Sequence, residues 1–360
     1  MTFRVVVWGT GNVGRPAIRA VAAHADLELV GVIVSNPDKV GVDAGELAGI
    51  GPVGVAATAD TSIATADGVD AVVYAVNADF RPAECAAEVE ACLRAGKNVV
   101  STAFYPLLHP ASAPKEFTDY LGAACTAGDS SVFVSGIDPG WALDILPLLL
   151  TGVCADITEI RAQEVFNYQL YDQPDAVRNL IGFGRPLDET PPMLLDFSLQ
   201  MVWAPMIRLV ADGLGLELEE IRTHVERRPL ERTIDVPGMG VFEEGMQGAF
   251  RFEVQGIVDG RPLIVMEHIT RIDDECAPDW QRPDHGQGVH RVVIEGRPHL
   301  EVTIHGTETG EKGAAGGGNA TAANRIVNAI PAVCAAPAGL IGLLSLPAIT
   351  GAAQIRRTPR

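Results

Sequence analysis

The first residues that could do chemistry form a glycine loop near the start of the chain. An apolar run, Phe3–Trp8, is followed by Gly9-Thr10-Gly11-Asn12-Val13-Gly14 and then by an amphipathic helical pattern. Glycines at this spacing allow a tight turn, a close approach of backbone to a pyrophosphate, and close packing of helix on strand. The helix N-terminus offers N–H groups and the positive end of its dipole to phosphates. The loop therefore predicts a dinucleotide site, although a bare structural turn would show the same glycines.

The end of the next apolar run bears on which dinucleotide binds. A site that prefers NAD usually carries Asp or Glu there, whereas this chain has Ser35 and Asn36, with Lys39 shortly after. Lys39 could meet a 2′-phosphate, or it could be a solvated lysine in a polar loop. We predict NADP(H) as the preferred cofactor and NAD(H) as a possible one, because Asp38 keeps an acid close by.

Further polar or small residues follow predicted strands at the same edge of the sheet, where ligands of such folds bind. The additional residues expected to contact the cofactor are Ala75, Val76, Asn77, Ser101, Thr102 and Asp138. Asp138 could hydrogen-bond the nicotinamide carboxamide, or it could be part of an ordinary turn or helix cap.

Two polar side chains interrupt apolar rows in the second half of the chain. Alternation along 157–171 places Glu164 on one face with Ile160, and a similar pattern places His268 with Met266. A carboxylate or an imidazole in apolar surroundings is suited to proton transfer. Glu164 could instead pair with a distant arginine, and His268 could be a satisfied core histidine, so both alternatives stay open.

The elements that position these residues differ between the two parts of the chain. Strand and helix patterns alternate over the first 140 residues, which predicts a doubly wound parallel sheet. From about Asp156 the runs are longer and alternate, which predicts an open mixed, largely antiparallel sheet. We therefore predict an α/β fold with a Rossmann domain over 1–150, completed by 319–360, and a second α+β domain over 151–318. A mobile segment, Gly310–Gly318, should precede the 319–360 segment, which should begin with a helix capped at Asn319 or Thr321.

Composition excludes several classes of partner. The chain has 27 Lys and Arg against 46 Asp and Glu, a net charge of −19, so neither nucleic acid nor an anionic membrane is an expected partner. The six cysteines show no ligand-like spacing, which favours free thiols in a reducing cytoplasm over a disulfide framework or a metal site. We find no signal peptide and no uninterrupted apolar span of about twenty residues.

Several longer motifs resemble a known family. They read GKNVVST (Gly96–Thr102), SGIDPGWALDILPLLLTGVC (Ser135–Cys154), NRIVNAIPAVCAAPAGL (Asn324–Leu340) and KVGVDAGELAG (Lys39–Gly49). The chain is similar to the dihydrodipicolinate-reductase-like group, and within it to 2,4-diaminopentanoate dehydrogenase and the native amine dehydrogenases. The resemblance implies a Rossmann domain, a second domain that binds substrate and builds a homodimer, and NAD(P)-dependent chemistry at a C–N bond.

The chain departs from this family just after Ser101-Thr102. Amine-active relatives carry one or two glutamates there, which can hold ammonium and act as general acid or base. Here the residues are Ala103, Phe104 and Tyr105, with Phe104 at the position of the key glutamate. An apolar ring cannot bind an amine proton, which weakens the amine interpretation. Tyr105 could donate a proton or form a pocket wall, so the catalytic candidates are Glu164, Tyr105 and His268.

Aromatic residues predict an apolar substrate pocket. The expected lining residues are Phe104, Trp141, Phe166, Tyr168 and Tyr171. Arg161 falls on the opposite strand face, so no arginine clamp for a charged amino acid is expected. We predict an oxidoreductase that acts on the C=O or C=N carbon of a small, mostly apolar substrate in an amine dehydrogenase-like reaction. The alternatives are a carbonyl reductase that does not use ammonia and a non-catalytic NADP(H)-binding sensor.

Overall fold

The computed structural model describes residues 2–171, 173–310 and 313–355, and the chain divides into two compact units. Unit 1 comprises Met1–Ile137 and Asn319–Arg360, and unit 2 comprises Asp138–Gly318. The division falls before the expected boundary near residue 150. The reason is that helix α5 (Ile145–Thr151) packs against strands and a helix of unit 2.

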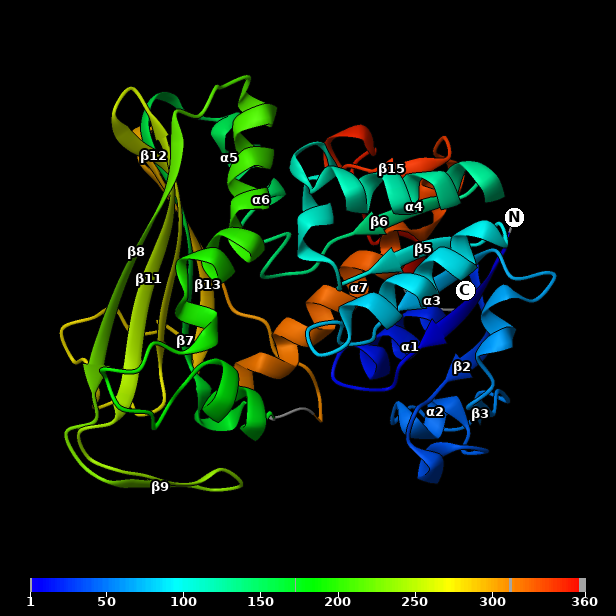
Figure 1. The fold of residues 1–360 in the computed structure, drawn as a ribbon, viewed down its shortest axis with the longest axis horizontal. Coiled ribbons are helices and arrows are strands. Elements are labelled where there is room, and N and C mark those ends of the chain that lie inside the picture. The colour runs from blue at the N-terminus through cyan, green and yellow to red at the C-terminus, as the bar shows by residue number, and fades with distance from the viewer. Residues whose placement is uncertain (1, 172, 311–312, 356–360) are drawn as a thin grey trace, which may run out of the picture. The chain divides into compact units, whose positions relative to one another are not determined.

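Unit 1 is built on a parallel sheet of seven strands in the order β15-β6-β5-β4-β1-β2-β3 (Figure 1). The strands are β1 (Phe3–Trp8), β2 (Leu27–Ile33), β3 (Ala57–Thr58), β4 (Ala71–Tyr74), β5 (Asn98–Ser101), β6 (Ser131–Val134) and β15 (Gly339–Ile341). The helices between them are α1 (Gly14–Ala23), α2 (Ala44–Leu47), α3 (Pro82–Arg94) and α4 (Lys115–Gly128). This is the doubly wound α/β architecture that the sequence predicts.

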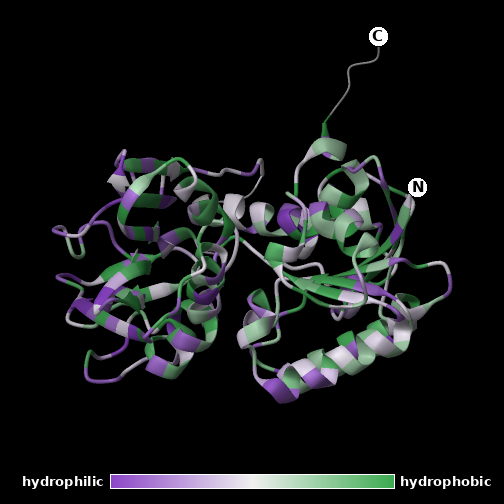
Figure 2. Ribbon diagram, turned by 90° about the horizontal axis from the view of Figure 1, so that it is seen from above, coloured by the Kyte–Doolittle hydropathy of each residue, from purple (hydrophilic) through white to green (hydrophobic). Residues whose placement is uncertain are grey.

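The central strands of this sheet are apolar because both of their faces are covered. Val5, Val6 and Val7 of β1 are at most 1% exposed, and Figure 2 shows hydrophobic colours along the parallel strands. Strand β1 pairs with β2 on one side and with β4 on the other. The carboxyl end of β1, with its glycine loop, therefore lies where the strand order reverses, which is where ligands bind in such sheets.

Unit 2 contains a mixed six-stranded sheet in the order β14-β13-β7-β12-β11-β8, in which only the pair β7–β12 is parallel among the described strands. The strands are β7 (Ala155–Asn167), β8 (Glu220–Pro229), β11 (Gln247–Val258), β12 (Arg261–Arg271), β13 (Gly288–Arg297) and β14 (Leu300–Ile304). A separate hairpin joins β9 (Ile234–Val236) to β10 (Gly240–Phe242). The long helix α6 (Asp196–Leu214) packs on β8, β11 and β12.

Side chains alternate between two faces of this sheet. On the face that meets α6, which we call the helical face, Trp203 of α6 packs against Phe252 and His268. On the opposite face lie the residues in between, such as Glu267 and Gln163. The same strands thus carry two chemically separate surfaces, because the side-chain period of a strand is two residues.

One element of the C-terminal return differs from the prediction. Helix α7 runs from Gly313 to Ala335, so the helix begins inside the Gly-rich segment and is not capped at Asn319 or Thr321. Positions 311 and 312 of the segment predicted to be mobile lie outside the described residues. At Gly317 a Cβ would lie 2.1 Å from the carbonyl oxygen of Gly306. The glycine is therefore needed for a close backbone approach, and this packing outweighs its weak helix propensity.

Among the described residues, no helix has the length and hydropathy that crossing a lipid bilayer requires.

Candidate active site

The glycine loop of unit 1 has the backbone geometry of a dinucleotide site. Gly9 has φ +107°, and a Cβ there would lie 2.7 Å from the carbonyl oxygen of Ala75. A Cβ at Gly14 would lie 2.1 Å from the carbonyl oxygen of Gly9, so helix and loop pack too closely for a side chain. At Gly11, by contrast, a Cβ would meet nothing within 4 Å, which leaves open space over the backbone. Val13 gives α1 no side-chain cap, so the loop and helix terminus fit a pyrophosphate.

Lys39 lies against this loop. It ends a short 3-10 turn, Pro37–Lys39, that Asn36 caps by accepting a hydrogen bond from the Asp38 backbone N–H. The Lys39 ammonium donates to the backbone oxygen and the hydroxyl of Thr10, at 3.2 and 3.1 Å. Ser35 and Asn36 are exposed at the end of β2, and Lys39 is half-buried. A positive charge is thus held beside the glycine loop.

The other predicted cofactor residues of unit 1 follow β4 and β5. Ala75 extends the β1–β4 pairing, since its N–H donates to the Trp8 carbonyl, and Val76 and Asn77 come next. The Ser101 hydroxyl is fully buried; it donates to the Tyr74 carbonyl and accepts from the Ala103 N–H. Ser101 therefore shapes the start of the loop, and Thr102 beside it is half-exposed.

Phe104 and Tyr105 also lie in unit 1. Phe104 has φ +67°, a left-handed backbone that a bulky residue rarely adopts. Its ring is 8% exposed and packs against Tyr74 and Phe117, at 6.3 and 5.6 Å between centroids. The Tyr105 hydroxyl donates to Asp79 at 3.4 Å. A contact of either residue with substrate stays a prediction.

Glu164 and His268, the other two catalytic candidates, are brought together on the helical face of unit 2. They face each other across the parallel pair β7–β12, and His268 Nδ1 lies 3.5 Å from Glu164 Oε1. The Tyr168 hydroxyl donates to the same oxygen at 2.9 Å. His268 Nε2 lies 2.9 Å from Asp138 Oδ2, and both atoms are buried without a well-aligned hydrogen bond. We call Asp138, Glu164, Tyr168 and His268 the proton cluster.

The charged groups of the proton cluster determine one another's protonation states. Burial lowers the pKa of His268, but the charges of Asp138 and Glu164 outweigh burial and raise the pKa to about 10. Burial raises the pKa of Glu164, but the nearby imidazoles hold it far below its usual range. Burial and the charge of Glu164 raise the pKa of Tyr168 well above its usual range. At neutral pH the cluster therefore holds an imidazolium between two carboxylates, beside a neutral phenol.

Aromatic rings surround the proton cluster. The His268 ring stacks on Phe252 with centroids 4.5 Å apart, and the Trp203 indole donates to Asp138 Oδ1 at 2.9 Å. Tyr168 stacks on Tyr171 at 4.6 Å and meets Phe166 edge-on. These rings exclude water from the charges and give the site an apolar wall. Trp141, also in unit 2, is half-exposed.

A metal ion is the alternative occupant of this cluster. Asp138, Glu164 and His268 each offer a ligand atom within 4.8 Å of the others. His268, however, turns one ring nitrogen toward each carboxylate, which is the arrangement of a protonated ring. A metal needs a deprotonated imidazole nitrogen, so we assign none to these residues.

Sequence reasoning missed three residues of this site. His290 lies directly opposite Glu164 on β13, and it interrupts the apolar row with Val292 and Ile294 by the same signal as Glu164. Trp203 and Phe252 could not be assigned without knowing which helix covers which strand. Among the described residues, the ion-pair partners of Glu164 are His268 and His290 and not an arginine. Asp138 contacts Trp203 and His268, so its contact with the nicotinamide stays a prediction.

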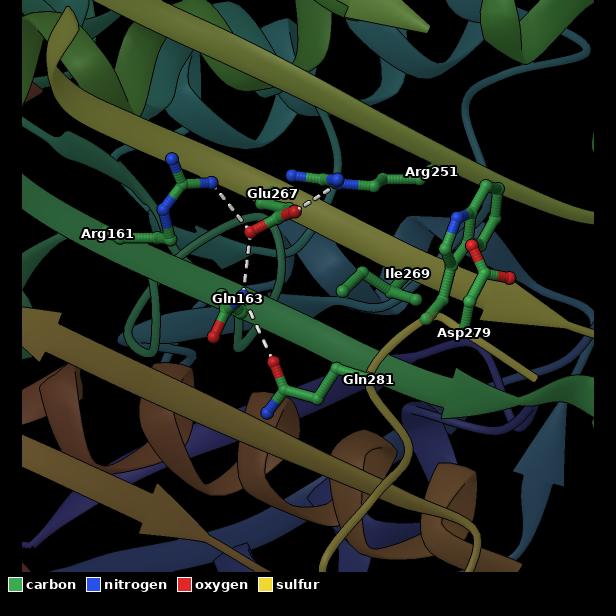
Figure 3. Close-up of a pocket in the computed structure, with 8 residues that line it drawn as sticks. Arg161, Gln163, Arg251, Glu267, Ile269, Asp279 and Gln281 are labelled. Carbon is green, nitrogen blue, oxygen red and sulfur yellow. Dashed lines mark hydrogen bonds and ion pairs between the residues drawn. The ribbon is translucent and has the colours of Figure 1, made fainter. Parts of the chain in front are cut away.

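The opposite face of the same sheet holds a pocket of about 290 Å³ (Figure 3). It is lined by Arg161, Gln163, Arg251, Glu267, Ile269, Asp279, Trp280 and Gln281. Glu267 lies at its centre and accepts from Arg161 at 2.7 Å, Arg251 at 2.5 Å and Gln163 at 2.7 Å.

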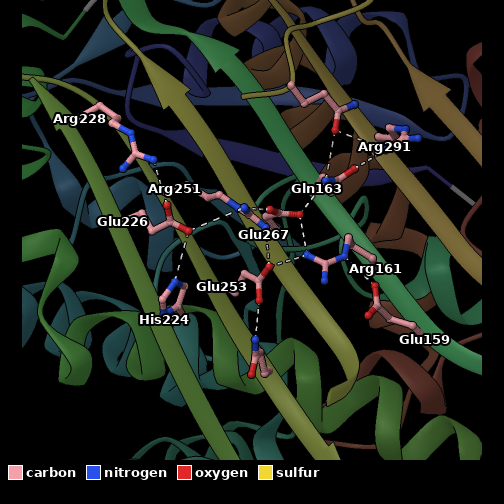
Figure 4. Close-up of polar contacts among 12 residues, drawn as sticks. Glu159, Arg161, Gln163, His224, Glu226, Arg228, Arg251, Glu253, Glu267 and Arg291 are labelled. Atoms are coloured by element: carbon pink, nitrogen blue, oxygen red, sulfur yellow. Dashed lines mark hydrogen bonds and ion pairs between the residues drawn. The ribbon is translucent and has the colours of Figure 1, made fainter. Parts of the chain in front are cut away.

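The charges in this pocket continue into a wider network across β8, β11, β12, β7 and β13 (Figure 4). Glu253 accepts from Arg161 at 2.7 Å and Arg251 at 2.9 Å, and Arg291 donates to Gln163 at 2.9 Å. We call these residues, with Glu267, the opposite-face network. Each of its arginines and glutamates has an oppositely charged partner, which for Arg291 is Glu301, so the network offers no unmatched group for catalysis, and we assign the active site to the helical face.

Comparisons with known proteins agree with this two-unit structure. Residues 3–105 match the family described as dihydrodipicolinate reductase, N-terminus, and residues 141–358 match the 2,4-diaminopentanoate dehydrogenase C-terminal domain. An amine dehydrogenase from Streptomyces virginiae is 54% identical over 344 residues, 95% of each chain. The 2,4-diaminopentanoate dehydrogenase of Acetoanaerobium sticklandii is 26% identical over 253 residues, 69% of this chain and 66% of that protein.

A solved structure, that of an amine dehydrogenase from Mycobacterium smegmatis, superposes with a TM-score of 0.74. The alignment covers 99% of both chains at 22% identity, so it shows similarity of fold alone. It supports the pairing of a parallel-sheet unit with a mixed-sheet unit.

Proposed function

The chain belongs to the amine dehydrogenase family of NAD(P)-dependent oxidoreductases, and from this premise we propose that it converts a small, mostly apolar ketone or aldehyde and ammonium into the amine. In this reaction the carbonyl compound, ammonium and reduced cofactor give amine, oxidised cofactor and water. The matches to the Streptomyces virginiae amine dehydrogenase and to the 2,4-diaminopentanoate dehydrogenase C-terminal domain confirm the family resemblance found in the sequence. The cofactor supplies the hydride when bound, so the protein must hold both substrates and move the protons.

The proton cluster is the single observation that carries the proposal. Loss of the carbonyl oxygen as water requires a proton, and the His268 imidazolium can donate one. Glu164 and Asp138 hold the positive charge on His268 in the resting state, and they can balance the charge of an ammonium or iminium group. In the reverse direction the neutral imidazole takes the proton back. Glu164, Tyr168 and His268 thus replace the family glutamate whose position Phe104 occupies.

The aromatic wall supports a mostly apolar substrate. Phe166, Tyr168, Tyr171 and Phe252 offer ring surfaces next to the carboxylates. Ring faces attract cations as well as apolar groups, which suits an amine with a hydrocarbon body. Arg161 and Arg251 of the same sheet belong to the opposite-face network, where both pair with Glu267 and are not free to bind a substrate carboxylate.

Lys39 supports a preference for NADP(H). Its ammonium is held beside Thr10 of the glycine loop, and no carboxylate ends β2, so a 2′-phosphate would meet a cation, although Asp38 lies next to Lys39 in the same turn. NAD(H) remains usable, because the loop that binds the pyrophosphate is common to both cofactors. The other predicted contacts are the loop Gly9–Gly14, Ser35, Asn36, Ala75, Val76, Asn77, Ser101, Thr102 and Asp138.

We further propose a homodimer in the cytoplasm. The family resemblance supports the dimer. All six cysteines are free, which fits a reducing compartment. Sedimentation at several protein concentrations tests the dimer: a monomer throughout would remove it.

The test of function is ammonium-dependent oxidation of NADPH with a panel of aldehydes and ketones. We expect turnover only when a carbonyl compound and ammonium are both present. Equal turnover without ammonium would show a carbonyl reductase, and tight NADPH binding with no turnover would show a sensor. In the same assay Lys39→Ala should raise the KM for NADPH about tenfold and leave that for NADH unchanged. Lys115→Ala, at a lysine that is 84% exposed on α4, serves as the matched control.

A further inference from the structure

A second histidine flanks Glu164 and takes no part in the steps above. His290 on β13 and His268 on β12 lie directly opposite Glu164 on its two neighbouring strands. His290 Nε2 is 3.6 Å from Glu164 Oε2, and His268 Nδ1 is 3.5 Å from Oε1. Each oxygen of the carboxylate therefore has an imidazole beside it.

Packing holds the His290 ring in this place. The ring meets Phe166 edge-on at 5.3 Å between centroids, and the side chain is 6% exposed. A Cβ at Gly288 would lie 2.4 Å from the Phe166 ring, so glycine allows Phe166 to lie beside β13. Nε2 is buried and has no hydrogen-bond partner among the described residues. His290 is thus fixed at ion-pair distance from Glu164, without a well-aligned hydrogen bond.

The groups around His290 determine what a change in its charge would do. Across β7 it faces Glu164, and through that carboxylate Tyr168 and His268. Across β14 it pairs with Ile304, and α5, which packs on β13, contributes no ionisable side chain. Two carboxylates and one imidazolium give the proton cluster a net charge of −1 when His290 is neutral. A protonated His290 would bring the sum to zero.

We infer that His290 sets the net charge of the proton cluster. This charge determines how strongly the site binds the cationic nitrogen substrate, which is ammonium or an alkylammonium ion, relative to the neutral carbonyl substrate. The inference rests on the proposed function. A buried site with net negative charge attracts a cation strongly, because little water screens it, and an added positive charge a few ångströms away removes that attraction. Binding of the neutral carbonyl compound does not depend on the net charge of the site.

The experiment compares the KM for ammonium with the KM for the carbonyl substrate between pH 5.5 and 8.5. Ammonium stays protonated over most of this range, so a change in its KM reports on the charge of the site. In the wild type the KM for ammonium should rise about tenfold toward the acid end, and the KM for the carbonyl compound should stay flat. His290→Gln keeps an N–H donor for Glu164 but cannot gain a charge, so its KM for ammonium should no longer depend on pH.

His224→Gln is the matched control. His224 also contacts a glutamate, with Nε2 3.4 Å from Glu226 Oε1, but it is 57% exposed on the opposite face. This variant should keep the wild-type pH profile. His290→Asn, a smaller neutral donor, replaces His290→Gln if that variant does not fold.

The inference is overturned if the neutral variants retain the pH dependence of the KM for ammonium, or if the KM for the carbonyl substrate follows the same profile. Either result leaves ammonium-dependent turnover, and with it the proposed function, intact. A wild-type enzyme whose turnover does not depend on ammonium would overturn both.

Discussion

The two faces of the six-stranded sheet use the same strands for opposite purposes. Neighbouring residues on β12 show the contrast: Glu267 points to the opposite face and His268 to the helical face. Glu267 is surrounded by donors that match its charge, whereas His268 and Asp138 keep buried atoms without well-aligned partners. A charge network in which every member is matched stabilises a fold. A network with uncommitted buried atoms is suited to act on a ligand.

The largest expected effect separates the faces by activity. Glu164→Gln should lower kcat for ammonium-dependent turnover by about 10²–10⁴-fold, the range that loss of a positioned acid–base group produces. Glu267→Gln, the same change on the other face, should keep kcat within a few-fold. Steady-state kinetics of the two variants, side by side, test the contrast. Equal losses of activity would show that the faces do not differ in function.

The next effect separates the faces by stability. Glu267 is 2% exposed, and Glu267→Gln leaves Arg161 and Arg251 without its charge. Glu253 still pairs with both arginines, so only hydrogen bonds between charged groups are lost, and the free energy of unfolding should fall by about 1.5–3 kcal/mol. Urea unfolding followed by circular dichroism measures it. A variant as stable as the wild type would show that this network is dispensable for folding.

The pH dependence of stability sharpens the comparison further. The pKa of His268 is raised, so its contribution is complete below about pH 6.5 and is lost as the pH rises through about 10. The pKa of Glu164 is lowered, so its contribution is present above about pH 4.5 and is lost only in stronger acid. The gap in unfolding free energy between wild type and His268→Gln should therefore be constant from pH 5 to 6.5 and narrow by pH 10.5 to the loss of ring packing on Trp203 and Phe252. A gap of the same size at pH 6 and pH 10.5 would contradict the assigned imidazolium.

The smallest effect concerns unit 1 and the position of the family glutamate. Phe104→Glu would put a carboxylate between Tyr74 and Phe117, where Phe104 is 8% exposed. Burying a polar group without a partner costs about 1–3 kcal/mol in proteins, so we expect a loss of stability and no gain in ammonium-dependent activity. Phe104→Leu is the control for the lost ring. A higher kcat in the Phe104→Glu variant would move the proton chemistry to this loop.

Much of the fold was predictable because its signals are local. The apolar run of β1, the glycines after it and the alternation along β7 each depend on a few adjacent residues. The predicted start of α7 was wrong. The observed start depends on a close backbone approach between Gly317 and Gly306, which a local sequence pattern does not reveal.

The site was predictable residue by residue but not as an arrangement. Alternation singles out Glu164 and His268, yet their pairing depends on the register of β7 against β12, which lie about a hundred residues apart in the chain. Asp138 reaches His268 from a third segment. The left-handed backbone of Phe104 has no sequence signal, since the residue type disfavours it.

The last strand of the parallel sheet has a consequence for synthesis of the chain. β15 pairs with β6, and the Ser131 hydroxyl bonds the carbonyl of Pro337, 206 residues later. At roughly 5–20 residues per second on the ribosome, β6 is synthesised about 10–40 s before its neighbour β15. During that interval an apolar strand edge is open to other nascent chains. All of unit 2 is synthesised during that interval. We therefore expect co-expressed chaperones that shield strand edges to increase the yield of folded protein, and to increase it more than thermostabilising substitutions in unit 2 would.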